Sequence, residues 1–297
     1  MFSLFMNAFT IKDIENLSGI KAHTIRIWEL RYSLLNPHRT DTNIRYYSNE
    51  ELQKILNIAL LNKYGYKISH IDRMTLDEMS EKIMALTQDN AQEERIMNEL
   101  IKYMAIVKME AFEKVLDSCI HTKGIEKSIL QVIFPFLERI GILWITNHIN
   151  PAQEHLVVNI IRQKLIVGID QLKTPTLPNK TLLLFLPEGE YHELGLLFMH
   201  FLLKSRGNKV VYLGSNVPIK DVAYVAEIKN PDYLFTHLTS VSPNFKMEKF
   251  ISNFQSRMPN RQIVASGGLT KRYKNEIPDN FSFKKSIPEI LSFISSL

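Results

Sequence analysis

The residues of this chain best suited to chemistry fall in two short clusters. The first is Glu190-x-His192-x-x-Gly195, in which a histidine follows an acid by two residues. Neutral imidazole is a good donor to a transition metal, and an acid two residues earlier can orient its second nitrogen and raise its basicity. Gly195 leaves room for a ligand that runs close to the backbone. A purely structural histidine would show the same pattern, so its place in the fold must decide between the two.

The second cluster is Trp144, followed ten and eleven residues later by Glu154 and His155. Asn150-Pro151 is typical of a helix N-cap followed by proline in the first turn, which would place Glu154 and His155 in that turn. Three large side chains are then expected to meet at one end of a helical bundle. The alternative is that Trp144 is a core residue, that Glu154 favours the helix dipole and that His155 has no role.

The N-terminal segment has the spacing of a helix-turn-helix. Helical patterns over residues 11–17 and 21–31 flank a tight break at Ser18-Gly19. On the second helix, Ile25 and Trp28 can face the core. The residues left outward, as a helix entering a major groove requires, are Lys21, His23, Thr24 and Arg26. Arg26 is the best candidate for a base or phosphate contact.

Two short extended arms around a polar turn at residues 40–43 predict a wing. Arg39 and Arg45 would then lie beside DNA phosphates, and tyrosines such as Tyr46 would supply an apolar body with a hydroxyl tip. These residues extend the predicted DNA contact beyond the second helix.

A further helix is predicted over residues 49–64, opened by a capping box of Ser48 and Glu51. With the segments before it, this part of the chain resembles the MerR family of transcriptional regulators over about residues 9–72. The matching motifs are Phe9-Thr10-Ile11, Ser18-Gly19-Ile20, Thr24-Ile25-Arg26-Ile27-Trp28-Glu29, Pro37-His38-Arg39, Arg45-Tyr46-Tyr47-Ser48 and Gly65-Tyr66-Lys67-Ile68. The resemblance implies double-stranded operator DNA as a partner and a homodimer that binds pseudo-palindromic sites.

The middle of the chain, residues 76–172, is expected to be a four-helix bundle. Pro135 lies inside one of the predicted helices and is expected to kink it. The helical patterns run over residues 94–103, 110–120, 125–143 and 152–172. Metal-sensing MerR regulators carry cysteines just after the wing, which this chain lacks, and a helical bundle argues against the aromatic barrel of multidrug-sensing relatives.

Beyond a proline-containing linker at residues 173–180, the pattern alternates between apolar strands and helices. The strands are expected at residues 181–186, 209–213, 233–238, 262–265 and 281–283, and the helices at about 192–206, 218–229, 244–258 and 286–296. Continuously apolar strands in such a repeat indicate a parallel sheet covered on both faces, a doubly wound Rossmann-like (flavodoxin-like) domain.

Ligands of such domains bind beyond the carboxyl ends of the strands. Besides the Glu190 cluster, these ends carry small residues that would let a long polar tail run near the backbone. They are Gly214, Ser215, Ser240, Ser242, Gly267 and Gly268. The absence of G-x-G-x-x-G after the first strand disfavours dinucleotides. The spacing of Glu190-x-His192-x-x-Gly195, Ser240 and Gly267-Gly268 resembles the cobalamin-binding domain of methionine synthase and the corrinoid mutases, with glutamate for aspartate as in the CarH and LitR photoreceptors.

The domain order resembles CarH-type transcriptional regulators over nearly the whole chain. Its parts are a DNA-binding domain at 1–75, the bundle at 76–172 and the Rossmann-like domain at 180–297. The resemblance implies adenosylcobalamin bound between the last two. His192 would then bind cobalt from below, Trp144 would cover the adenosyl group, and Glu154 and His155 would contact its sugar or the adjoining bundle surface.

The function implied is non-enzymatic repression controlled by assembly state. In the dark an oligomer, a dimer or a tetramer, would bind the operator with avidity, and light would break the cobalt–carbon bond and release the promoter. In the light sensors a histidine directly follows the bundle tryptophan, whereas this chain has Ile145, with His148 as a possible substitute. Light sensing is therefore a weaker expectation than cobalamin binding.

Two other functions stay open on the sequence. One is a cobalamin-independent repressor whose C-terminal domain docks an antirepressor or partner protein. The other is a corrinoid methyl carrier, against which the helix-turn-helix pattern argues.

The composition is compatible with a regulator of this kind. The chain has 297 residues, 45% of them hydrophobic, a net charge of +5 and one cysteine. That length can bury two or three small cores, and the charge permits binding to nucleic acid without proving it. A single cysteine, Cys119, excludes a disulfide framework within one chain and is expected to be a small buried residue on a helix. The pattern shows no leader or membrane span, so a cytoplasmic location is expected.

Overall fold

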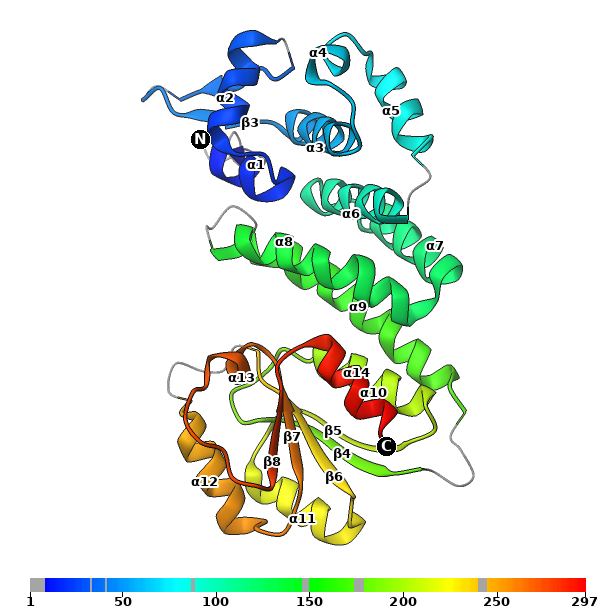
Figure 1. Cartoon of the computed structure of the whole chain (residues 1–297), viewed down its shortest axis with the longest axis vertical. Coiled ribbons are helices and arrows are strands. Elements are labelled where there is room, and N and C mark those ends of the chain that lie inside the picture. The colour runs from blue at the N-terminus through cyan, green and yellow to red at the C-terminus, as the bar shows by residue number, and fades with distance from the viewer. Residues whose placement is uncertain are drawn as a thin grey trace. The chain divides into compact units, whose positions relative to one another are not determined.

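The computed structural model describes residues 9–32, 34–40, 42–86, 89–145, 150–173, 179–239 and 245–297, with only the backbone for 142–145. The chain forms two compact units, Met1–Ile160 and Ile161–Leu297 (Figure 1). The boundary falls within one long helix, α9 (Pro151–Gln171). The finer division predicted at 1–75, 76–172 and 180–297 stays a prediction.

The first unit begins with the predicted winged helix-turn-helix. Its elements are β1 (Phe9–Thr10), α1 (Ile11–Ser18), α2 (Ala22–Arg31), β2 (His38–Arg39), β3 (Arg45–Tyr47), α3 (Asn49–Lys63), α4 (Ile68–Ile71) and α5 (Leu76–Met84). The helices predicted at 11–17 and 21–31 are confirmed to within one residue. Gly19 ends α1 with a left-handed φ of 75°, a conformation that glycine adopts without strain and that turns the chain sharply into α2.

The wing is a small antiparallel sheet in the order β1-β3-β2. The helix that follows it is capped by Ser48, whose side chain accepts a hydrogen bond from the Glu51 N–H (3.3 Å). The predicted capping box is present only in this half, because the Glu51 carboxylate instead accepts from the N–H of Asn36 (3.0 Å). Glu51 thereby ties the chain before the wing to the start of α3. A full capping box forms where none was predicted, between Thr10 and Asp13 at the start of α1.

Four helical segments follow, as predicted. They are α6 (Asp89–Ala105), α7 (Met109–Ser128), α8 (Phe134–Ile145), which a π-helical turn η1 (Ile129–Ile133) joins to α7, and α9. The boundary predicted between 120 and 125 appears as a break at Gly124, where φ is 77°. Just before Pro135, where a kink was predicted, the structure has the π-helical turn η1, since a residue without an N–H cannot complete the regular hydrogen-bond ladder.

The start of α9 confirms the predicted N-cap. Asn150 Oδ1 accepts from the Ala152 N–H (2.9 Å), and Gln153 Oε1 accepts from the Asn150 N–H (3.0 Å). The Gln153 amide also donates to the Met104 and Ala105 carbonyls, which joins this turn to the end of α6. Cys119 is buried in α7, as predicted.

The second unit is a five-stranded, all-parallel sheet in the order β5-β4-β6-β7-β8. Its strands are β4 (Thr181–Pro187), β5 (Lys209–Val217), β6 (Tyr233–His237), β7 (Ile263–Ser266) and β8 (Phe281–Lys284). Its helices are α10 (Leu194–Ser205), α11 (Ile219–Lys229), α12 (Met247–Arg257), α13 (Gly268–Arg272) and α14 (Ile287–Ser295). The predicted doubly wound fold is confirmed, and helices cover both faces of the sheet (Figure 1).

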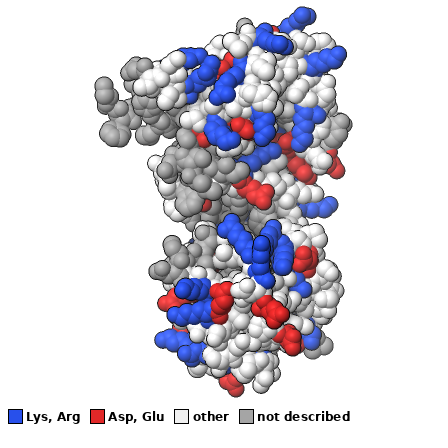
Figure 2. All heavy atoms as spheres, turned by 60° about the vertical axis from the view of Figure 1, so that its left-hand side comes forward, with Lys and Arg blue, Asp and Glu red and all other residues white. Residues whose placement is uncertain are grey.

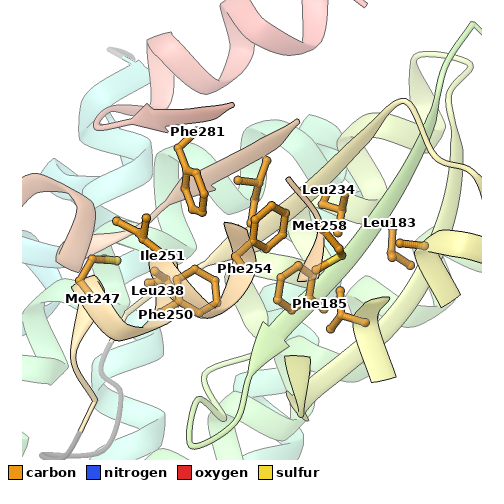
Figure 3. Packing of buried hydrophobic residues seen from close by; sticks show 13 residues of the cluster. Leu183, Phe185, Leu234, Leu238, Met247, Phe250, Ile251, Phe254, Met258 and Phe281 are labelled. Atoms are coloured by element: carbon orange, nitrogen blue, oxygen red, sulfur yellow. The ribbon is translucent and has the colours of Figure 1, made fainter. Parts of the chain in front are cut away.

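One apolar core lies between this sheet and the helices α11 and α12. Leu183 and Phe185 of β4 point into it, whereas the alternate residues of the same strand face the other side, where α10 contacts β4. Phe254 of α12 is fully buried and packs edge-on against Phe281, with ring centroids 5.1 Å apart (Figure 3). Strand β4 is buried on both faces, which explains why its residues are apolar at successive positions.

Two local details differ from the sequence expectation. The strand predicted to end at residue 213 continues to Val217, because a bulge at Leu213 and Gly214 lets β5 bend and resume pairing with β4. The short helix α13 was not predicted. In the described residues, no helix combines the length and apolar character that crossing a membrane requires.

Replacing Phe254 with alanine is expected to lower the free energy of unfolding by about 3–5 kcal/mol, because it leaves a cavity in this core. Denaturant unfolding of the full chain measures the change. Tyr224→Ala on α11, where the side chain is 69% exposed, is the control and should change stability by less than about 0.5 kcal/mol. Equal effects of the two substitutions would contradict the packing described.

Candidate ligand site and nucleic-acid interface

The Glu190 cluster lies at the point where the sheet changes its winding direction. Strand β4 is hydrogen-bonded to β5 on one side and to β6 on the other, so the connections leaving β4 and β6 diverge to opposite faces. In open parallel sheets, ligands bind in the crevice outside the carboxyl ends of such strands. Glu190 and His192 follow β4, and Thr239 follows β6.

The Glu190 carboxylate is fully buried and bonded on both oxygens. Oε1 accepts from the backbone N–H of His192 (2.9 Å), and Oε2 accepts from the N–H of Thr239 (2.8 Å). Its backbone carbonyl accepts from the Asn216 N–H at the end of β5 (3.1 Å). A buried carboxylate is tolerated only when hydrogen bonds replace its hydration, and these bonds join the ends of β4, β5 and β6.

The same carboxylate orients the His192 ring. Glu190 Oε1 lies 2.7 Å from His192 Nδ1. An ionised carboxylate can only accept, so with Glu190 ionised Nδ1 carries a proton, and in the neutral ring the lone pair is then on Nε2. The His192 side chain is 52% exposed, in contrast to the buried acid that holds it. Orientation by a buried acid, combined with an accessible ring, is the arrangement of a metal-binding histidine.

The predicted residues Gly214 and Ser215 lie within β5 instead of in a loop after it. Gly214 has φ of 82°, and a Cβ there would lie 3.2 Å from Glu193 Oε1. Asn216, two residues on, accepts through Oδ1 from the N–H of Gly189 (2.9 Å). The bulged end of β5 therefore supports the loop that carries Glu190.

His237, at the end of β6, is a residue of this region that sequence reasoning missed. A Cβ built on Gly195 would lie 2.4 Å from His237 Cδ2 and 2.5 Å from Nε2, so the imidazole occupies the space beside the glycine. His237 Nδ1 and the Ser266 hydroxyl of β7 lie 2.8 Å apart. Burial lowers the pKa of His237 to about 4, so the ring is neutral at neutral pH. The sequence signal that could have identified His237 is a histidine near the end of a predicted apolar strand, at the last residue of β6.

The predicted glycine pair also meets protein atoms. Gly267 has φ of 100°, and a Cβ there would lie 2.3 Å from the Leu238 carbonyl oxygen. This close approach lets the β7 loop dock on the end of β6, where the Leu269 N–H donates to the same carbonyl (3.2 Å). At Gly268 there is more room, because a Cβ built there would have the Thr239 carbonyl oxygen as its nearest neighbour, at 3.7 Å.

A second chain of polar contacts flanks the site at the start of α10. Glu193 accepts from the Tyr212 hydroxyl (3.0 Å) and pairs with Arg162 of α9 (2.7 Å). His200 stacks on Tyr212 with ring centroids 5.1 Å apart, and burial lowers the pKa of His200 to about 4. Through Arg162, these contacts tie the part of α9 that belongs to the second unit to the sheet.

The remaining predicted site residues lie elsewhere or outside the described residues. Trp144 is in the last turn of α8, as predicted, but its side chain is not described. Glu154 and His155 lie in the first turn of α9, half-buried and exposed respectively. Ser240, Ser242 and His148 fall outside the described residues.

The predicted DNA-contacting residues lie on α2 and the wing. Ile25 and Trp28 are buried, Arg26 is exposed on the opposite face and Thr24 is half-buried, as the helical pattern predicts. On the wing, exposed Arg39 donates to Asn43 Oδ1 across the turn (2.6 Å). Tyr46 stacks on His38, with centroids 5.3 Å apart.

Arg45 is held inside the domain more firmly than predicted. Its Nε donates to Glu29 of α2 at 3.0 Å, and the Tyr47 hydroxyl donates to the other oxygen of the same carboxylate. Burial, with Glu29 beside it, raises the pKa of Tyr47. Arg45 therefore fixes the wing against α2, and a phosphate contact would have to use its remaining N–H groups.

Basic side chains are widely distributed over the surface. Figure 2 shows Lys and Arg spread over the visible face of the N-terminal region, and Lys and Arg intermixed with Asp and Glu in the C-terminal unit. Charge alone does not mark one interface, so the expected DNA interface is placed by the exposed arginines of α2 and the wing.

Comparison with known proteins agrees with this geometry. Residues 9–78 match the MerR HTH family of regulatory proteins. The match runs from β1 into α5, so the N-terminal domain has the pattern of a MerR-type helix-turn-helix domain. The chain is also 26% identical to the HTH-type transcriptional repressor CarH of Myxococcus xanthus, over 89% of this chain and 90% of that repressor. Its identity to CarA of the same organism is 28%, over 70% and 68%. The chain is thus similar to a MerR-type transcriptional repressor over nearly its whole length.

Behind the MerR-type domain, the fold resembles a solved structure. The monomethylamine corrinoid protein of Methanosarcina barkeri aligns with a TM-score of 0.55 and 11% identity, covering 69% of this chain and all of that protein. At this identity the likeness concerns the fold alone. It agrees with the order seen here, helices followed by a parallel α/β domain.

Replacing Glu190 with alanine is expected to cost about 1–3 kcal/mol of stability, because the backbone N–H of Thr239 loses its buried acceptor. Chemical denaturation measures the loss. Glu188→Ala in the same loop, where the side chain is exposed, is the matched control and should be nearly neutral. A stable Glu190→Ala protein would show that the carboxylate does not hold the strand ends together.

Proposed function

We propose that this MerR-type regulator is a repressor that senses cobalamin, with His192 as the lower ligand of the cobalt. The observation that carries the proposal is the exposed His192 ring held through Nδ1 by buried Glu190 at the winding change of the sheet. The likeness to CarH and to the fold of a corrinoid protein supports it. Operator DNA would be bound by α2 and the wing.

The residues present fit the lower ligand. Cobalamin, when bound, supplies a cobalt that accepts a neutral nitrogen donor, and His192 Nε2 has the lone pair for it. Glu190 would keep the ring aimed and increase its basicity. Gly195, Gly214, Ser215, Gly267 and Gly268 border this region, and Ser240 and Ser242 are proposed to do so from the sequence alone.

The residues proposed to cover the adenosyl side of the cofactor are proposed from the sequence alone. Trp144, Glu154 and His155 belong to the first unit, and their contact with an adenosyl group is a proposal from the CarH resemblance. We propose adenosylcobalamin as the form bound, with an oligomer assembled in the dark as the operator-binding state. Ile145 after Trp144 makes cobalamin binding the primary proposal and light the secondary one.

One observation favours a second function, a cobalamin-independent repressor whose C-terminal domain docks another protein. The His237 ring fills the space beside Gly195 that a long ligand would use. Under this alternative, His192 and Glu190 are structural. Corrinoid uptake by the purified chain distinguishes the two.

Full-length protein purified in the dark with adenosylcobalamin is expected to retain the corrinoid absorbance, and His192→Ala to bind it at least about tenfold more weakly, because one cobalt bond is lost. His121→Ala, an exposed histidine of α7, is the control and should bind as wild type. Oligomer mass before and after green illumination then tests the assembly switch. The docking function would be favoured if the purified chain took up no corrinoid, or if His192→Ala bound it as tightly as His121→Ala.

Arg26→Ala is expected to weaken binding to the promoter upstream of its own gene by about 1–3 kcal/mol, because an exposed α2 contact is removed. Gel shift at several salt concentrations measures both affinity and salt slope. Lys229→Ala, exposed on α11, is the matched charge control and should leave both unchanged. Unaltered binding by Arg26→Ala would contradict a recognition role for α2 through Arg26.

Arg45→Ala is expected to weaken binding to the same promoter and in addition to lower thermal stability, since it leaves Glu29 without its cationic partner.

A further inference from the structure

The space between the start of α10 and the end of β6 is occupied by one side chain. Gly195 lies in the first turn of α10, and the place where its Cβ would stand is taken by the edge of the His237 ring, at 2.4 and 2.5 Å. A glycine here is usually a sign of close approach by a ligand or by the chain itself. In this protein the approach is made by the chain's own imidazole.

The ring is held from the other side by the sheet. Its Nδ1 is hydrogen-bonded to Ser266, the last residue of β7, at 2.8 Å, and Ser266 is itself buried. The neutral state of the ring fits this setting, because burial lowers the pKa of His237 more than nearby Glu190 raises it. A neutral ring with one satisfied nitrogen packs between helix and sheet without an unpaired charge.

The location is close to the proposed cobalt ligand. His192 stands three residues before Gly195, and Thr239, which bonds Glu190, stands two residues after His237. A corrinoid bound through His192 would have its long nucleotide tail to accommodate. A tail that passed between α10 and the sheet beside Gly195, along what is here called the tail path, would meet the His237 ring.

We propose that His237 is a specificity residue that closes the tail path and so selects among corrinoids by their nucleotide tail. A corrinoid without a tail binds at His192 with the ring in place, whereas one with a tail requires the ring to leave Gly195 and Ser266. This inference rests on the proposed function, since it takes His192 as the cobalt ligand. It adds which part of the cofactor the protein discriminates.

The test compares cobalamin with cobinamide, a corrinoid that lacks the nucleotide, by absorbance titration of the full chain in the dark. The ratio of the two dissociation constants in wild type also contains the cost of removing the tail base from cobalt. The change in that ratio on mutation is therefore the readout. His237→Ala is expected to tighten cobalamin binding about tenfold and to change cobinamide binding less than about twofold.

His237→Phe is the matched control, because it keeps a ring of similar size beside Gly195 while removing the bond to Ser266. It should bind cobalamin no better than wild type. Thermal unfolding of both variants establishes that each is folded under the titration conditions. An equal gain with phenylalanine would show that bulk is not what limits the tail, which would overturn the proposal.

Failure of this inference can be told apart from failure of the proposed function. Suppose that His237→Ala changes the affinities for both corrinoids equally, or changes neither, while His192→Ala weakens cobinamide binding. His192 is then still supported as the cobalt ligand, and the proposed selection by His237 is overturned. If neither corrinoid binds, or if His192→Ala leaves the affinity for both unchanged, the proposed function and this inference are both overturned and the docking function is favoured.

Discussion

The second unit depends on one buried acid. The Glu190 carboxylate has no contact with solvent, yet it sits where three parallel strands end, a place rich in backbone groups that strand pairing leaves unsatisfied. Its bonds to the backbone of His192 and Thr239 satisfy both partners and link two loops that leave the sheet in different directions. The same oxygen that anchors the loop also sets the His192 ring, so the fold and the candidate site share a single constraint.

The MerR-type domain uses a similar arrangement. Glu29, almost buried at the end of α2, accepts from Arg45 and Tyr47 of β3 and thereby fixes the wing relative to the helix. The relative positions of helix and wing determine which DNA groups they can reach together. In both units an acid that is costly to bury positions a surface for which a function is proposed, and its hydrogen bonds offset that cost.

Much of the fold could be predicted because its signals are local. Apolar runs at residues 181–186 and 233–238 are long enough for buried strands, and the Asn150-Pro151 dipeptide starts a helix for reasons contained in the dipeptide itself. The end of β5 was misplaced because a bulge at Gly214 depends on its pairing with β4, which no local pattern records. The Glu51 carboxylate likewise bonds Asn36 instead of closing its own capping box.

The sequence by itself determined the MerR-type domain, the order of strands and helices, and the pairing of an acid with His192, because residue spacing along one segment fixes each of them. Only the tertiary structure decided what lies beside Gly195. His237 comes from another strand, and parallel strands are brought together by crossovers whose contacts leave no periodic trace in the chain. The same reason explains why Arg45, an apparent phosphate ligand by position, turned out to be bonded to Glu29.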